Sequence, residues 1–332
     1  MGPNAWWPAA VAAGLSVAIV AVLVAVAGPG GGTTPDPAPE RYRGPDVVLP
    51  PSEPLGDLGR PRPQAGPGLP QGDSRTVTLE HDGIERGYFL LPALGLEPDE
   101  PAALLVVLHQ EVSSGPEVAV DLGLDVLRRH GVTLAYPNGF GGSWNSGLCC
   151  GVAAAQDVDD VGFVNAVLDD VGRRTPVDPD RRALLGYSGG GMLAYRLMCE
   201  QHPPLLAVVE VNGSLEAPCA EELELPDLLA VHGELDGSIG LTEPVFVNHL
   251  GMSPRPVGST LDAVTDRAGC APRATRTVND VQVWTYDRCR GGARVDVQVV
   301  PWAGHGWADV GGAPRAAAWL LPRLVPRSGR SG

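Results

Sequence analysis

The serine in the segment Gly186–Gly190 (GYSGG) is the strongest candidate for chemistry in this chain. An apolar run, Ala183–Leu185, precedes it, and an amphipathic stretch that begins near Met192 follows. Strand, G-x-S-x-G and helix in this order are typical of a nucleophile elbow. The small residues allow a strained turn that exposes the Ser188 hydroxyl and points helix N–H groups toward it. We therefore predict that Ser188 is a nucleophile; an ordinary glycine-rich turn is the alternative.

A serine hydroxyl needs a general base, which on folds with this elbow follows the serine in the chain. Two histidines lie beyond position 240. His305 follows the apolar run 295–300 in a short loop, whereas His249 lies in an irregular stretch. We therefore predict His305 as the base, with a packing role as the alternative.

The acid that orients the base is expected between the serine and the histidine. The apolar run 228–231 ends in His232-Gly233, and Glu234 and Asp236 lie in the loop that follows. We predict Asp236 as the third member of the triad, with Glu234 as the second choice. An acid in a solvated loop is the unreactive alternative, and His232 is expected to hydrogen-bond locally.

The elements that must position these residues are short apolar runs separated by helical patterns. Such runs predict strands covered on both faces of a mostly parallel, doubly wound α/β sheet, here with an antiparallel start around the turn His81-Asp82-Gly83. Strands are expected at 76–79, 85–91, 104–108, 132–136, 183–186, 206–211, 228–231 and 295–300, and helices at 116–129, 159–171, 190–200 and 314–324.

Several separated blocks resemble the polyhydroxybutyrate depolymerase-type esterases, a family that includes feruloyl and acetylxylan esterases. The resemblance implies the α/β-hydrolase fold in a single catalytic domain, no cofactor, and Ser188, Asp236 and His305 as the triad. It rests on Leu108-His109, 135–139 (AYPNG), 142–145 (GSWN) with Cys149-Cys150, 159–163 (DDVGF), 186–200, 232–236 and 304–307.

The chain departs from this family at the loop that follows the strand 104–108. Gln110 and Glu111 follow His109, where the family has a glycine and another small residue. The oxyanion hole is expected to use the backbone amides of Gly189 and of Gln110 or Glu111. A carboxylate turned inward would repel the developing negative charge. We therefore expect Glu111 to point outward, toward an arginine.

Three further residues are candidates for the substrate pocket. Trp144 and Trp307 are expected to wall an acyl or aromatic group, and Asn145 to lie beside them. Core packing is the alternative for both tryptophans.

The first part of the chain has the composition of a targeting segment and a linker rather than of a folded domain. Residues 1–27 contain an uncharged apolar run, 8–27, which is long enough to span a bilayer, so this segment is a signal sequence or a transmembrane anchor. Residues 28–72 contain 22 Gly or Pro in 45 positions and predict a disordered linker. Residues 73–332 are expected to form the catalytic domain outside the cytoplasm, held at the membrane if 8–27 is not cleaved.

The six cysteines lie in the exported part and predict disulfides rather than a metal site. No C-x2-C or H-x3-H spacing suits zinc. We expect Cys270 to pair with Cys289, and Cys199 with Cys219, while the pairing of Cys149 and Cys150 stays open.

The charge excludes several classes of protein. The formal net charge is −15, and every basic residue is arginine. Nucleic-acid binding needs a basic surface. Walker-A loops, lysine Schiff bases and Ser-Lys dyads need an amine that the chain lacks.

The sequence thus predicts a serine esterase that acts on a small or polymeric ester outside the cytoplasm. Two alternatives stay open. One is a peptidase on the same fold, and the other is a surface-tethered binding protein whose esterase scaffold is impaired by the Gln110-Glu111 change.

Overall fold

The computed structural model describes residues 74–200 and 204–325 of the chain. The expected signal or anchor (1–27) and linker (28–72) lie outside these residues. Within the described part of the chain, no helix combines the length and the apolar character needed to cross a membrane.

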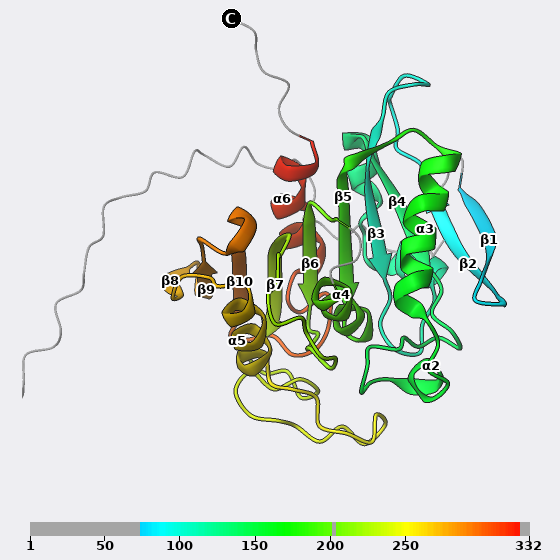
Figure 1. Ribbon diagram of the computed structural model, residues 1–332. Coiled ribbons are helices and arrows are strands. Elements are labelled where there is room, and N and C mark those ends of the chain that lie inside the picture. The colour runs from blue at the N-terminus through cyan, green and yellow to red at the C-terminus, as the bar shows by residue number, and fades with distance from the viewer. Residues whose placement is uncertain (1–73, 201–203, 326–332) are drawn as a thin grey trace, which may run out of the picture. The chain divides into compact units, whose positions relative to one another are not determined.

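One ten-stranded sheet organises the described residues (Figure 1). Its strand order is β1-β2-β4-β3-β5-β6-β7-β10-β9-β8, and neighbouring strands from β4 to β10 pair in parallel. Antiparallel hairpins extend both edges. The strands are β1 (Arg75–His81), β2 (Ile84–Leu91), β3 (Ala102–Leu108), β4 (Val132–Pro137), β5 (Val177–Tyr187), β6 (Ala207–Val211), β7 (Asp227–Gly233), β8 (Ala274–Val278), β9 (Val281–Tyr286) and β10 (Val295–Val300).

Helices cover both faces of this sheet. Alternate residues of the wholly buried strand β3 enter two separate cores, with Leu104 and Val106 on one face and Leu105 and Val107 on the other. The first face carries α3 (Asp160–Arg174), α4 (Gly189–Cys199) and α5 (Val257–Arg267). The opposite face carries α1 (Gly115–Asp121), the 3₁₀ helix η1 (Asp125–His130) and α6 (Gly312–Leu324). The remaining helices, α2 (Gly151–Ala155) and the 3₁₀ turn η2 (Arg290–Gly292), are short.

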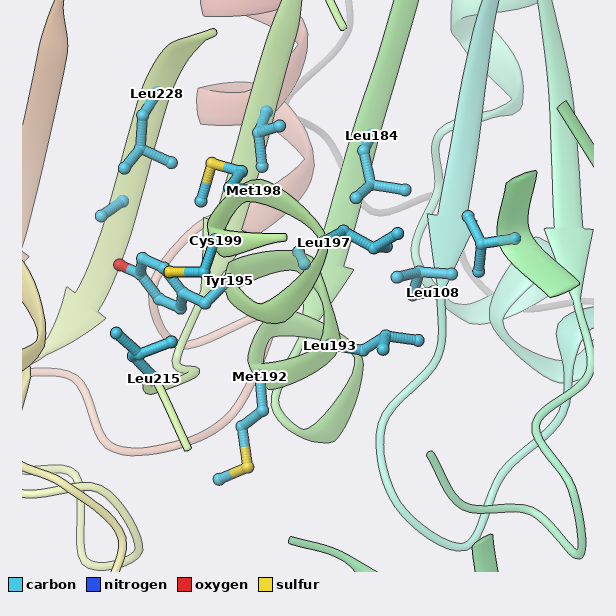
Figure 2. Close-up of a cluster of buried hydrophobic side chains, with 14 of the residues drawn as sticks. Leu108, Leu184, Met192, Leu193, Tyr195, Leu197, Met198, Cys199, Leu215 and Leu228 are labelled. Carbon is cyan, nitrogen blue, oxygen red and sulfur yellow. The ribbon is translucent and has the colours of Figure 1, made fainter. Parts of the chain in front are cut away.

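Helix α4 packs at the centre of the first core (Figure 2). In this view the helix lies between Leu108 and Leu184 on one side and Leu215 and Leu228 on the other. Its buried side chains come from every turn, so the helix that follows Ser188 is held on all sides. These side chains are Met192, Leu193, Ala194, Tyr195, Leu197, Met198 and Cys199.

The predicted sheet and its antiparallel start are confirmed, whereas one expected helix needs correction. The helix expected at 116–129 is two helices, because Gly123 adopts a positive φ of 66° between α1 and η1. Helix α5 and the hairpin β8–β9 were not predicted. All five residues of β8 are exposed, so this edge strand has no apolar alternation that a sequence pattern could reveal.

Three disulfides join the six cysteines. Cys199, the last residue of α4, is bonded to Cys219 in the loop after β6. Cys270, after α5, is bonded to Cys289, just before β10. These are the two expected pairings, and the open pair Cys149-Cys150 forms a disulfide between adjacent residues.

Candidate active site

The turn at Ser188 has the strained geometry that a nucleophile elbow requires. Ser188 joins β5 to α4 with a φ of 53° and a ψ of −117°, in a region that non-glycine residues rarely adopt. A Cβ atom at Gly186 would collide with the backbone of Gly190, and one at Gly190 would collide with the carbonyl of Leu108. The glycines on either side of the serine are therefore required by close backbone approach.

The structure brings Ser188, His305 and Asp236 together from the carboxyl ends of three parallel strands. The Ser188 Oγ lies 2.8 Å from His305 Nε2, and His305 Nδ1 lies 2.7 Å from Asp236 Oδ2. Because a carboxylate can only accept, Nδ1 carries the proton and Nε2 is free to accept the serine proton. The alternative acid, Glu234, is exposed.

Asp236 is held as an ionised acceptor. Its Oδ1 accepts from the amides of Ser238 at 2.7 Å and Ile239 at 2.9 Å. Burial acts to raise the pKa of Asp236, but the hydrogen bonds with His305, Ile239 and Ser238 outweigh it and hold the pKa below its ordinary value. A charged partner is therefore available to an imidazolium at position 305.

The loop that carries His305 is fixed through its backbone by side chains from neighbouring strands. The Tyr187 hydroxyl donates to the His305 carbonyl at 3.0 Å and accepts from the Trp307 amide at 3.2 Å. Asn212, which follows β6, donates to the same carbonyl at 2.8 Å. These bonds set the position of the imidazole relative to Ser188.

The loop 109–111, which is expected to supply oxyanion amides, is fixed by hydrogen bonds at both of its peptide groups. The Trp144 indole donates to the His109 carbonyl at 2.8 Å. The His109 Nε2 accepts from the Gly139 amide at 2.8 Å, so its Nδ1 donates to the Gln110 carbonyl at 2.7 Å. Since the N–H of a trans peptide points opposite to its C=O, the amides of Gln110 and Glu111 are both held in place.

The buried imidazole of His109 is neutral. Burial lowers its pKa to about 4, against smaller raising effects from the Gln110 carbonyl and Glu117. His109 therefore holds the loop in place by hydrogen bonds rather than acting as a catalytic acid or base.

The outward orientation expected for Glu111 is wrong. Glu111 lines the same pocket as Ser188. Gly189 has no side chain, and a Cβ atom at that position would lie 2.6 Å from Glu111 Oε1, so the carboxyl fills this space. Burial raises the pKa of Glu111 to about 7; the Trp144 backbone lowers it and Asp160 raises it further. No arginine lines this pocket.

A pocket of about 170 Å³ surrounds the triad serine and histidine. The predicted residues Gln110, Glu111, Gly189, Ser188 and His305 all line it. Sequence patterns did not indicate the others, most of which come from an irregular segment or from the buried side of α4. The unpredicted lining residues are Cys150, Tyr187, Met192, Ser238, Ile239, His249 and Leu250.

Trp144, Asn145 and Trp307 do not line this pocket, contrary to expectation. Trp144 is fully buried, and its indole donates to the His109 carbonyl instead. Trp307 is buried in the other core, where its indole donates to the Leu122 carbonyl at 3.2 Å. The Asn145 amide side chain donates to Asp157 and to the Val158 carbonyl, so its polar groups are occupied within its own loop.

His232 is buried, and in place of the expected local hydrogen bond it pairs with Glu210 on the neighbouring strand β6 at 2.8 Å. Asp159 caps α3, accepting from the Gly162 amide at 2.8 Å. In the described part of the chain, no group of three or more His, Cys, Asp or Glu side chains is arranged to hold a metal ion.

The sheet order, the elbow after β5 and the loops after β7 and β10 give the described residues the α/β-hydrolase fold. An acetyl xylan esterase from Aspergillus awamori has the same fold; the match covers 75% of this chain and 99% of that one, with a TM-score of 0.53 and 13% identity. No family model matches the sequence.

Sequence relatives specify the class further. Feruloyl esterase C of Emericella nidulans is 26% identical over 229 residues, which cover 64% of this chain and 78% of the relative. A protein named as an esterase, NocK, from Nocardia uniformis subsp. tsuyamanensis is 33% identical over 221 residues, covering 62% of this chain and 64% of the relative. The chain is thus similar in sequence to esterases, in agreement with its resemblance to feruloyl esterases.

Proposed function

We propose that the protein is a serine carboxylic-ester hydrolase that acts through an acyl-enzyme. The observation that carries the proposal is the continuous hydrogen-bonded chain from Ser188 through His305 to Asp236. Ser188 Oγ attacks the ester carbonyl while His305 Nε2 takes its proton. His305 then returns that proton to the departing alcohol, and Asp236 stabilises the imidazolium between the two steps. Water attacks the acyl-enzyme by the same route, releasing the acid and restoring Ser188.

The tetrahedral oxyanion is held by backbone amides. The Gly189 amide, at the start of α4, supplies one donor, and Gln110 or Glu111 supplies the other. Support for this assignment comes from the two hydrogen bonds that fix the His109 and Gln110 carbonyls, because they leave little freedom to the amides of the loop.

The proposed substrates are small esters, including aromatic acyl esters of the kind that feruloyl esterases are named for. Esters of polymers, including polyhydroxybutyrate, are within the same proposal because of the resemblance of the sequence to the polyhydroxybutyrate depolymerase-type esterases. We place the enzyme outside the cytoplasm, since three disulfides persist best in an oxidising compartment. No cofactor enters the proposed mechanism.

The test is hydrolysis of p-nitrophenyl acetate and butyrate by the wild type, Ser188→Ala, His305→Ala and the double variant. Each single variant should lose several orders of magnitude in kcat, and the double variant should be little worse, because triad members act as one unit. Asp236→Asn should lower kcat by about 10⁴-fold through the wrong imidazole tautomer. Independent, additive losses would contradict the assignment. Acetyl, butyryl, feruloyl and polyester substrates then rank the substrate classes.

An impaired esterase that serves as a binding protein is the second candidate. The observation that favours it is the Glu111 carboxyl beside Gly189, where an ionised group opposes the oxyanion. The kinetics of Glu111→Gly and Gln110→Gly separate an active esterase from an impaired binding protein. If Glu111 impairs the site, Glu111→Gly should raise kcat with little change in KM, since only the transition state carries the charge. A lower kcat in both variants would show that the loop is already competent.

A further inference from the structure

Two acceptor oxygens in the active-site pocket have no donor in the part of the chain that the structure describes. Glu111 Oε1 and Gln110 Oε1 are both shielded from solvent, and neither has a hydrogen-bond partner among the described residues. Both side chains line the pocket that contains Ser188. Buried acceptors without partners are costly, so their presence in a binding pocket points to a ligand that supplies donors.

The charge around Glu111 specifies what kind of donor fits. Of the residues that line the pocket, none is an arginine, and the chain contains no lysine. Asp160, which lies outside the pocket and is itself paired with Arg86, raises the pKa of Glu111 further. The net charge of −15 extends this bias to the whole chain, so approaching cations are favoured over anions.

We propose that Glu111 and Gln110 form a subsite for a protonated amine, and that the preferred ester carries such an amine near its scissile carbonyl. This inference rests on the proposed esterase function. The ammonium donates an N–H to Glu111 Oε1 or to Gln110 Oε1, and its alkyl groups meet the apolar side chains that also line the pocket. Those side chains are Met192, Ile239 and Leu250.

The same subsite resolves the conflict between Glu111 and the oxyanion. A bound ammonium neutralises the carboxylate beside Gly189, so the negative charge that develops on the carbonyl oxygen no longer faces an unpaired negative group. An uncharged ester provides no such compensation. The residue that departs from the family pattern therefore selects the substrate.

Two pairs of esters test the proposal, each differing by one charged atom. On the alcohol side, 2-(dimethylamino)ethyl butyrate is compared with 3-methylbutyl butyrate. On the acyl side, methyl 4-(dimethylamino)butanoate is compared with methyl 5-methylhexanoate. At pH 7.5 the wild type should favour the amine in one of the pairs by about tenfold in kcat/KM, which corresponds to about 1.4 kcal/mol. Glu111→Gln should bring that ratio close to one.

Glu85→Gln is the matched control, because Glu85 is exposed on β2, and it should keep the wild-type ratio. The ratio of two substrates on one sample is independent of the fraction that is folded, so a destabilised variant still gives an answer. Equal rates within both pairs in an active wild type would overturn the subsite alone. No hydrolysis of any of the four esters, with no effect of Ser188→Ala, would instead overturn the esterase proposal on which it rests.

Discussion

The buried ion pair between Arg86 and Asp160 should be the most sensitive electrostatic contact near the active site. Arg86 Nη2 lies 2.6 Å from Asp160 Oδ1, with side chains 3% and 0% exposed. The guanidinium also lies 3.7 Å above the Phe163 ring. Asp160 Oδ2 accepts from the Asn145 amide at 2.7 Å, so the pair fixes the loop that leads to the pocket residue Cys150.

The expected magnitudes follow from two opposing terms. At 2.6 Å and an effective dielectric constant of about 20, the attraction is about 6 kcal/mol. Removing two ions from water costs several kcal/mol each. Burial accordingly lowers the pKa of Arg86 and raises that of Asp160 in spite of their attraction. The ion pair therefore contributes little net free energy to folding, whereas either charge buried alone is strongly unfavourable.

Arg86→Met should therefore lower the free energy of unfolding by about 3 to 5 kcal/mol, because it leaves a buried carboxylate unpaired. For a domain of this size, such a loss lowers Tm by roughly 6 to 20 °C. Adding Asp160→Asn should recover part of the loss, since the Asn oxygen still accepts from the Asn145 amide and carries no charge.

Chemical denaturation and calorimetry of the two single variants and the double variant measure this coupling. Arg276→Met, at an exposed position of β8, is the control and should change stability by less than about 0.5 kcal/mol. A loss below about 1 kcal/mol for Arg86→Met, or a double variant less stable than Arg86→Met, would refute this reasoning.

Three further predictions concern the bridges and loops around the site. Replacing Cys270 and Cys289 by serine should cost roughly 3 kcal/mol in unfolding free energy, because their bond closes a loop with a sequence separation of 19 residues; an unchanged denaturation midpoint would contradict this. Trp144→Phe leaves the buried His109 carbonyl without its donor and should lower kcat more than it raises KM, whereas a pure KM effect would argue against support of the oxyanion loop. Because the pKa of Glu111 is raised to about 7, its carboxyl is neutral below that pH and ionised above it. For an uncharged ester, kcat should therefore fall as pH rises beyond about 7, and Glu111→Gln should remove this fall; a decline that persists in the variant would assign it to another group.

The sequence was sufficient wherever a local pattern carries the information. The elbow at Ser188 and the loops that hold Asp236 and His305 each follow a short apolar run, and such runs predict strands reliably when both faces are covered. Parallel strands then bring their carboxyl ends to one edge, so residues far apart in the chain meet there.

The directions of side chains could not be predicted from such patterns, because they depend on neighbours from elsewhere in the chain. Glu111 turns inward since Gly189, 78 positions later, leaves space for it. Trp144 turns inward to donate to the His109 carbonyl, and nothing near Trp144 in the sequence indicates this contact. The segment containing Ile239 and His249 lines the pocket without any apolar period, so it gave no signal.

The hydrogen bonds of Tyr187 and Asn212 to the His305 carbonyl also bear on how this enzyme can diversify. The His305 loop is positioned by the strand that leads to Ser188 and by the neighbouring strand, whereas Asp236 depends on the amides of Ser238 and Ile239. The pocket residues His249 and Leu250 take no part in these hydrogen bonds. Substitutions there can therefore alter which ester fits without displacing the proposed proton-transfer groups. Libraries for directed evolution are best confined to these two positions, because the amides of Gln110 and Glu111 are the proposed oxyanion donors.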